Sequence, residues 1–224
     1  MEKIKQDQTK EQIVIRKLIS EAEIDQAMMM RFNELKNLPY YKNLEQFYDV
    51  ELEAGRNMFN NGQACAAFNE KGEIVAIVIA FDLTFEPYNI SKRLLRGTEK
   101  LRSIRQDARK ILSAQPGEYC FVGYSVARKD YRRQQLIHKI CLILFDDLLL
   151  NLRFKRLVVI SVSKEGFLSS VKLGYKVLKY YGAWEEDDKN EYYNGGEIKE
   201  GVTFQVLSTL DSDKHQELNR AAKL

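Results

Sequence analysis

The sequence contains few prolines, histidines and cysteines, and each shortage excludes a class of protein. Only 3 of the 224 residues are proline, and no Gly/Ser-rich or repeated segment interrupts the chain, so nothing marks a linker between two domains. The 2 histidines and 3 cysteines lack the spacing of a metal site or of a Ser-His-Asp nucleophile. We therefore expect no metal. The odd number of cysteines favours free thiols in a reducing compartment, and we expect a cytoplasmic protein.

Long apolar runs are also missing. The longest, residues 140–150, is interrupted by Asp146 and Asp147 and is shorter than the roughly 20 residues that cross a membrane. The polar N-terminus lacks the apolar segment of a signal peptide. A net charge of +3 is too small to indicate nucleic-acid binding by itself. With 45% hydrophobic residues, the length is that of one globular domain with a substantial core and no membrane partner.

The spacing of apolar residues predicts the order of elements. We expect a disordered arm at 1–11, one domain at 12–211 with a helical insertion at about 82–117, and a polar tail at 212–224. The first half of the domain is predicted to contain a strand at 13–15, helices at 20–36 and 43–60, a β-hairpin formed by 64–68 and 74–81, and a basic amphipathic helix at 91–114. Ser20 is a possible helix cap.

The centre of the chain has the pattern of a crossover unit. A strand at 119–126 precedes a helix at 136–152 with one broad apolar stripe, and a second buried strand follows at 157–162. This succession is typical of two parallel strands joined by a helix. A short helix at 167–173 and strands at 176–184 and 202–210 complete the domain. The loop at 185–200 between these last strands holds seven acidic residues and two lysines.

The stretch "YRRQQLIH", residues 131–138, joins the first crossover strand to its helix. In an open sheet, ligands bind beyond the carboxyl ends of parallel strands, and the free N–H groups of a helix that begins there attract anions. Arg132 and Arg133 can add charge and hydrogen bonds. The glycine patterns of dinucleotide sites and P-loops are absent. The junction therefore indicates either a different kind of anion site or a solvated helix start.

The order of elements and two motifs resemble the GNAT superfamily of acetyl-CoA-dependent N-acetyltransferases over about 13–210. "VARKDYRRQQLI" resembles the motif in which Arg or Gln, two free positions, Gly, one free position and Gly or Ala present backbone amides to the coenzyme A pyrophosphate. Arg132 matches its first position, while Gln135 and Ile137 stand at the small-residue positions. "SSVKLGYKVL" resembles the signature Y-x-x-x-G-F, with Ser170 in place of the tyrosine.

The resemblance implies an α/β (α+β) fold whose mixed, mostly antiparallel sheet has a central parallel βαβ crossover and flanking helices. It implies acetyl-CoA as co-substrate and a small-molecule or peptide amine that attacks the thioester directly. A homodimer is compatible with it. The strand end and the helix start would bind the coenzyme through Ser125, Val126, Arg132, Arg133, Gln134, Gln135, Leu136, Ile137 and His138.

Three residues are candidates for proton transfer. Strict alternation along the first crossover strand predicts one shared face for Glu118, Cys120, Val122, Tyr124 and Val126. Glu118 is the only acid on that face and could remove a proton from the amine, although a surface carboxylate is the commoner role. Tyr124 is either a pocket wall or a proton donor. Ser170 stands where the family's general-acid tyrosine would be.

Other hypotheses stay open. The residues at 135, 137 and 170 also favour a catalytically inactive GNAT-fold protein that binds an acyl-CoA or a protein partner in a regulatory role. The basic helix at 91–114 could form a solvated face, pair with the acidic loop, select an acidic substrate or contact nucleic acid. The acidic loop could instead attract a cationic amine. These two charge patterns favour opposite substrates.

Overall fold

The computed structural model describes residues 12–36, 41, 43–89, 91–152, 154–162, 164–183 and 204–211. Its centre is a seven-stranded sheet in the order β1-β2-β3-β4-β5-β7-β6, in which β4 and β5 are parallel and all other neighbours are antiparallel. The strands are β1 (Val14–Lys17), β2 (Gly62–Phe68), β3 (Ile74–Asp82), β4 (Tyr119–Ala127), β5 (Arg156–Ser161), β6 (Lys176–Ala183) and β7 (Phe204–Asp211). The predicted mixed sheet with a central parallel crossover is confirmed.

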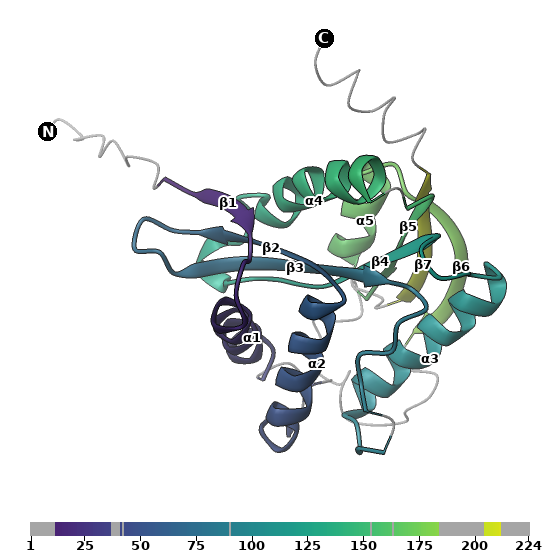
Figure 1. Cartoon of the computed structure of the whole chain (residues 1–224), viewed down its shortest axis with the longest axis horizontal. Coiled ribbons are helices and arrows are strands. Elements are labelled where there is room, and N and C mark those ends of the chain that lie inside the picture. The colour runs from purple at the N-terminus through teal and green to yellow at the C-terminus, as the bar shows by residue number, and fades with distance from the viewer. Residues whose placement is uncertain are drawn as a thin grey trace, which may run out of the picture.

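Helices cover both faces of the sheet (Figure 1). One face carries α1 (Glu21–Leu35), α2 (Tyr48–Asn60) and α3 (Arg96–Ile111), and the other carries α4 (Leu136–Asp146) and α5 (Lys164–Lys172). Two separate groups of buried apolar side chains correspond to these faces. We call them the α1–α3 core and the α4–α5 core. Among the described residues, no helix has both the length and the apolar character to cross a membrane.

Local signals explain several boundaries. The predicted cap is present, because the Ser20 hydroxyl accepts a hydrogen bond from the Glu23 N–H at 3.3 Å at the start of α1. The turn between β2 and β3 is held by the Asn69 side chain, which accepts hydrogen bonds from the N–H groups of Lys71 and Glu73. Gly72 has a φ of 75° there, a conformation that glycine adopts without steric cost.

Several helices differ from the predicted ranges. The segment predicted as a helix at 43–60 begins with a 3₁₀ turn, Leu44–Phe47, before α2, and α5 begins at Lys164 rather than at 167. The crossover helix leaves α-geometry after Asp146 and ends in a π-helical turn, Asp147–Asn151. This wider turn rotates the residues that follow off the apolar stripe, and Leu152, expected inside the stripe, is 49% exposed. The basic helix begins at Arg96 rather than at 91, because Leu94 and Leu95 are buried in the segment leading into it and Leu95 is extended.

Parts of the predicted organisation lie outside the described residues. These are the N-terminal arm at 1–11, the tail at 212–224 and the acidic loop at 185–200. The segment predicted as an insertion is described except for residue 90, and it contains α3 between β3 and β4. The three cysteines, Cys65, Cys120 and Cys141, are unpaired and buried.

Candidate functional site

The parallel strands β4 and β5 separate after a short paired region. Their pairing joins Tyr119–Phe121 to Arg156–Val158 and goes no further in the described structure. The second half of β4 therefore has an open edge on the side of β5. Ser125 and Val126 lie on this open half, next to the carboxyl end of the strand, where ligands bind in sheets with parallel strands.

A β-bulge interrupts β4 on its other edge. Ile77 of β3 pairs with Val126, and Ile79 pairs with Gly123. Between these two pairs β4 advances by three residues and β3 by two, so β4 contains one extra residue. Tyr124 lies within this extra length and has a φ of 52°, in the left-handed region that residues with a side chain seldom adopt. Such conformations cost roughly 1–3 kcal/mol and often occur at functional sites.

The bulge changes which side chains share a face. Cys120 and Val122 belong to the α4–α5 core, while Phe121, Tyr124 and Val126 lie in or against the α1–α3 core. The prediction that Val122, Tyr124 and Val126 share one face is therefore wrong. The extra residue inverts the alternation, so that Tyr124 faces the same helices as Phe121.

The start of α4 keeps a turn of the kind that glycine favours, although no glycine is present. Arg133 and Gln135 have φ values of 73° and 57°, and Gln135 is the residue that precedes the helix without a capping hydrogen bond from its side chain. Leu136 is buried in the α4–α5 core, and Ile137 is half-buried against the same core. The first-turn amides remain available to an anion. His138 is half-buried, and burial and Lys172 lower its pKa.

Arg132 is already engaged by an acid. Its Nη2 lies 3.0 Å from Glu34 Oε2 of α1, and its Nε donates a long hydrogen bond of 3.5 Å to the Ala127 carbonyl. Gln134 is exposed beside it. An anion bound at the helix start would share Arg132 with Glu34, or replace Glu34 as its partner.

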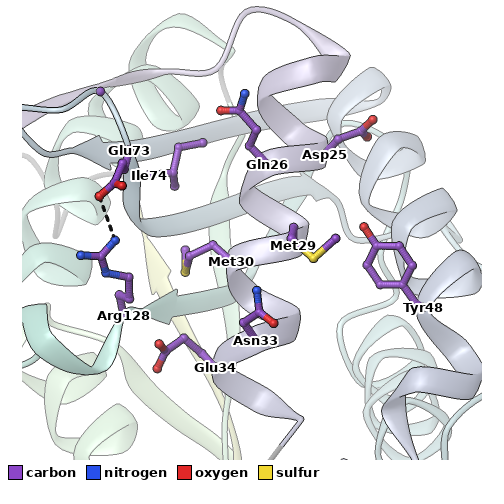
Figure 2. A pocket seen from close by; sticks show the side chains of 11 residues that line it. Asp25, Gln26, Met29, Met30, Asn33, Glu34, Tyr48, Glu73, Ile74 and Arg128 are labelled. Carbon is purple, nitrogen blue, oxygen red and sulfur yellow. Dashed lines mark hydrogen bonds and ion pairs between the residues drawn. The ribbon is translucent and has the colours of Figure 1, made fainter.

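Glu34 also lines a groove of about 650 Å³, which Figure 2 shows. One wall is α1, with Met29, Met30 and Glu34, and the opposite wall contains Glu73 and Arg128. Arg128 Nη1 lies 3.2 Å from Glu73 Oε2, the contact drawn in Figure 2. The groove thus lies next to the segment between β4 and α4.

The structure does not bring the three predicted proton-transfer residues together. Glu118 lies in the turn before β4, about 20 Å along the strand from Tyr124, and forms a 2.6 Å ion pair with Lys155. Hydrogen bonding from Lys155 and from the Gln115 N–H lowers the pKa of Glu118. Ser170 is buried in α5, 3.1 Å from the Ser161 hydroxyl, and donates to the carbonyl of Gly166. The roles of these residues remain predictions.

A buried polar network meets Tyr124, and sequence reasoning did not identify its other members. Glu51 of α2 is 4% exposed and accepts three hydrogen bonds, from Arg31 at 3.3 Å, from the Tyr88 hydroxyl at 3.1 Å and from the Thr98 hydroxyl at 2.8 Å. The Tyr124 hydroxyl donates to the Tyr88 hydroxyl at 2.8 Å. A continuous chain of hydrogen bonds therefore links the bulge to a buried carboxylate.

The surroundings keep this network in defined protonation states. Burial lowers the pKa of Arg31, but Tyr41, Glu51, Tyr88 and Tyr124 together raise it above its usual value. The Arg31 guanidinium also lies 5.0 Å from the centre of the Tyr124 ring. Burial is the main reason that the pKa of Tyr124 is raised to about 12 and that of Tyr88 well above 10. Both hydroxyls are protonated at neutral pH.

The basic helix α3 turns part of its charge inward. Arg102, Arg105 and Arg109 surround Glu86, at distances of 3.4, 2.8 and 3.7 Å from its carboxylate oxygens. Arg109 also donates hydrogen bonds to the carbonyls of Leu83 and Phe85. The interpretation of α3 as a wholly solvated basic face is therefore wrong for these three arginines, because they close onto the segment that follows β3.

Within the residues that the structure describes, no group of three or more His, Cys, Asp or Glu side chains could hold a metal ion. The groups that this region offers are backbone amides, hydroxyls, guanidinium groups and one buried carboxylate. They can bind an anion at the start of α4, hydrogen-bond an extended ligand along β4, and accept or pass a proton at Tyr124.

No protein-family model matches the sequence, and no curated protein matches it either. Solved structures match it in fold. Arylalkylamine N-acetyltransferase 2 from Aedes aegypti is 12% identical, with a TM-score of 0.62 over 89% of this chain and 99% of that one. A mutant of agmatine N-acetyltransferase in its apo form is 13% identical, with a TM-score of 0.60 over 89% of this chain and 100% of that one.

An acetyltransferase of the GNAT family from Streptococcus pneumoniae is 10% identical and has a TM-score of 0.54, over 89% of this chain and 99% of that one. At such identities the likeness concerns the fold and not the chemistry. The resemblance expected from the sequence motifs is confirmed at that level: from β1 to β7, the chain has the fold of the GNAT acetyltransferases.

Proposed function

We propose that the protein is an acyl-CoA-dependent N-acyltransferase that uses acetyl-CoA and an amine acceptor. One observation carries the proposal: the open, bulged half of β4 is joined to the start of α4 by a short segment with a 3₁₀ turn, Lys129–Tyr131, and two left-handed residues. A strand edge with free backbone groups suits an extended pantetheine chain, and a helix start suits a pyrophosphate. Similar folds in proteins named for the acetylation of agmatine and arylalkylamines support the same assignment.

Each part of this region has a role in the proposal. The first-turn amides of α4 hold the pyrophosphate, with Arg132 and Arg133 adding charge. The backbone near Ser125 and Val126 binds the pantetheine and orients the thioester carbonyl. Because Gln135 already adopts the left-handed conformation, the turn has the backbone shape that such a ligand needs, at the cost of local strain.

The buried network supplies a route for the proton. The neutral amine attacks the thioester carbonyl, the C–S bond breaks with coenzyme A leaving as its thiolate, and the amine nitrogen loses one proton. Tyr124 accepts that proton while passing its own to Tyr88, and Tyr88 passes its proton to Glu51. The two hydroxyls act as a relay and neither ionises, which agrees with their raised pKa values. Glu51 is the final acceptor in this scheme.

Calorimetry with acetyl-CoA, desulfo-CoA and a coenzyme A lacking its 3′-phosphate tests the proposal, together with an assay for thiol release over a broad panel of amines. Arg132→Ala is expected to weaken coenzyme binding about tenfold, as the loss of a charge-assisted hydrogen bond should. Glu34→Gln is expected to strengthen it, because Arg132 loses its competing partner. Lys155→Ala, which removes an exposed cation at the opposite end of β4, serves as the control.

Failure to bind any of the three coenzymes would refute the proposal. A second candidate function is a catalytically inactive protein that binds an acyl-CoA in a regulatory role. Two observations favour it: Arg132 is paired with Glu34, and the Ser170 hydroxyl is already bonded to the backbone of its own helix. Coenzyme binding without transfer to any amine in the panel would establish this second function.

A further inference from the structure

Three arginines in α3 share a single carboxylate. Arg105 Nη2 donates to Glu86 Oε1 at 2.8 Å, while Arg102 and Arg109 approach Glu86 Oε2 at 3.4 and 3.7 Å. A second acid, Asp82, also acts on the charge of Arg109 and accepts hydrogen bonds from the backbone N–H groups of Thr84 and Gly117. Three guanidinium charges therefore face two carboxylates, and the cluster keeps an excess of positive charge in a partly desolvated place where such an excess is costly.

Arg105 has donors without an acceptor. Its side chain is 2% exposed, and among the described residues neither its Nε nor its Nη1 finds a hydrogen-bond partner. The rings of Phe81 and Phe121 lie 5.4 and 5.8 Å from the guanidinium carbon, which offers attraction to the charge but no acceptor atom. A buried guanidinium with unused N–H groups is suited to bind an anion from outside the chain.

The cluster lies near the proposed site of acyl transfer. Arg105 and Tyr124 both pack against Phe81: the guanidinium carbon and the centre of the tyrosine ring lie 5.4 and 6.3 Å from the centre of its ring. The guanidinium carbon is therefore at most about 12 Å from the centre of the Tyr124 ring. Figure 1 places α3 on the same face of the sheet as α1 and α2. Arg102 and Arg109 are 23% and 22% exposed, so the cluster also has a side that reaches solvent.

We propose that Arg105, with Arg102 and Arg109 beside it, binds an anionic group of the acceptor, so that the preferred substrate is an amine bearing a carboxylate or a phosphate on a short spacer. This inference rests on the proposed acyl transfer at Tyr124 and specifies its substrate. Both anions match the guanidinium donors, and the cluster is unsuited to an acceptor whose far end is cationic, because like charges would meet in a poorly solvated place.

Matched acceptor pairs provide the test. Acetyl transfer is compared between γ-aminobutyrate and butylamine, 4-(aminomethyl)benzoate and benzylamine, and phosphoethanolamine and ethanolamine. In each pair the two amines differ in the anionic group. We expect kcat/KM to be at least about tenfold higher for the anionic member of a carboxylate or phosphate pair, the range of a hydrogen bond to a charged group. The carboxylate and phosphate pairs then distinguish the two anions.

Variants assign the preference to the cluster. Arg105→Met keeps an apolar side chain beside the two phenylalanine rings and should abolish the preference, mainly by raising KM for the anionic amine. Lys110→Met removes one exposed cation from the same helix and should leave the preference intact. Glu86→Gln should increase the preference, because it removes the acid that competes for the arginines. If Arg105→Met fails to fold, Glu86→Gln decides the question.

Direct binding keeps this inference separate from the proposed enzyme activity. Calorimetry with γ-aminobutyrate and butylamine, in the absence of coenzyme, should show tighter binding of the anionic amine that Arg105→Met removes. That result supports the anion site even if no coenzyme binds. Coenzyme binding and acetyl transfer with equal use of both members of every pair would overturn the anion site and leave the transferase intact. A preference unchanged in Arg105→Met would overturn it as well.

Discussion

Removal of the buried carboxylate at the centre of the polar network should cost much of the protein's stability. In Glu51→Leu the Arg31 guanidinium remains charged and loses its only ion-pair partner among the described residues. The two side chains are 6% and 5% exposed, so water cannot replace the lost contact without local opening. Breaking a buried ion pair from one side costs about 3–5 kcal/mol. The hydroxyls of Tyr88 and Thr98 also lose their acceptor.

Urea unfolding measures this loss as a change in the free energy of unfolding. For a chain of this length, 3–5 kcal/mol corresponds to a fall in Tm of roughly 6–20 °C. The double variant Arg31→Met, Glu51→Leu removes both charges and should recover most of the stability, because apolar side chains can replace a buried pair at little cost. Glu53→Leu is the control: it lies on the same helix in an exposed pair with Lys92 and should cost less than 1 kcal/mol.

Two outcomes would refute the reasoning. A loss below about 1 kcal/mol in Glu51→Leu would mean that the Arg31 charge is solvated, or has another partner. A double variant as unstable as the sum of the two single variants would mean that the two side chains stabilise the fold independently of each other. In either case the network could not be a single unit that holds Tyr124 at the bulge.

Two further predictions concern strain and pH. Gln135→Gly should raise the free energy of unfolding by about 0.5–1 kcal/mol and tighten coenzyme binding, because glycine adopts the left-handed conformation without strain. The control Gln134→Gly should instead lower the free energy of unfolding by a similar amount. Equal losses in both variants would show that Gln135 is not strained. Burial raises the pKa of Tyr124 to about 12. The contribution of the protonated Tyr124 hydroxyl to stability should therefore be complete below pH 10 and be lost as the pH rises from 10 to 12. Unfolding followed by circular dichroism measures the loss, and an identical alkaline decline in Tyr124→Phe would contradict the prediction.

The order of elements was accessible from the sequence because it depends on local patterns. Apolar residues at helical spacing predicted α4, and two apolar strands on either side of it predicted the parallel pair β4 and β5. The start of α4 was equally accessible, since the residues of the proposed anion site are contiguous in sequence. The end of α4 was not predicted, because a change to π-geometry depends on tertiary packing and leaves no clear periodic signal.

The buried network was missed because its members come from separate segments, although each carried a local signal. Glu51 stands three, four and seven residues before Ala54, Gly55 and Met58, which are the other buried residues of α2. Arg31 follows Ile24, Ala27 and Met28 at the same spacings in α1. A charged residue on the apolar face of a helix requires a buried partner, and these two face each other across the α1–α2 interface. Opposite charges on the apolar faces of successive helices could have suggested the pair.

The position of Tyr124 could not be inferred from alternation, and the proposed chemistry depends on it. Period-two reasoning along β4 is valid only until a residue is inserted, and the insertion at the bulge is recorded in the pairing with β3 rather than in the composition of β4. Without the bulge, Tyr124 would face the α4–α5 core with Cys120 and Val122, away from Tyr88 and Glu51. The bulge therefore turns one hydroxyl toward the buried carboxylate, on the half of β4 whose other edge is left open where the pairing with β5 ends.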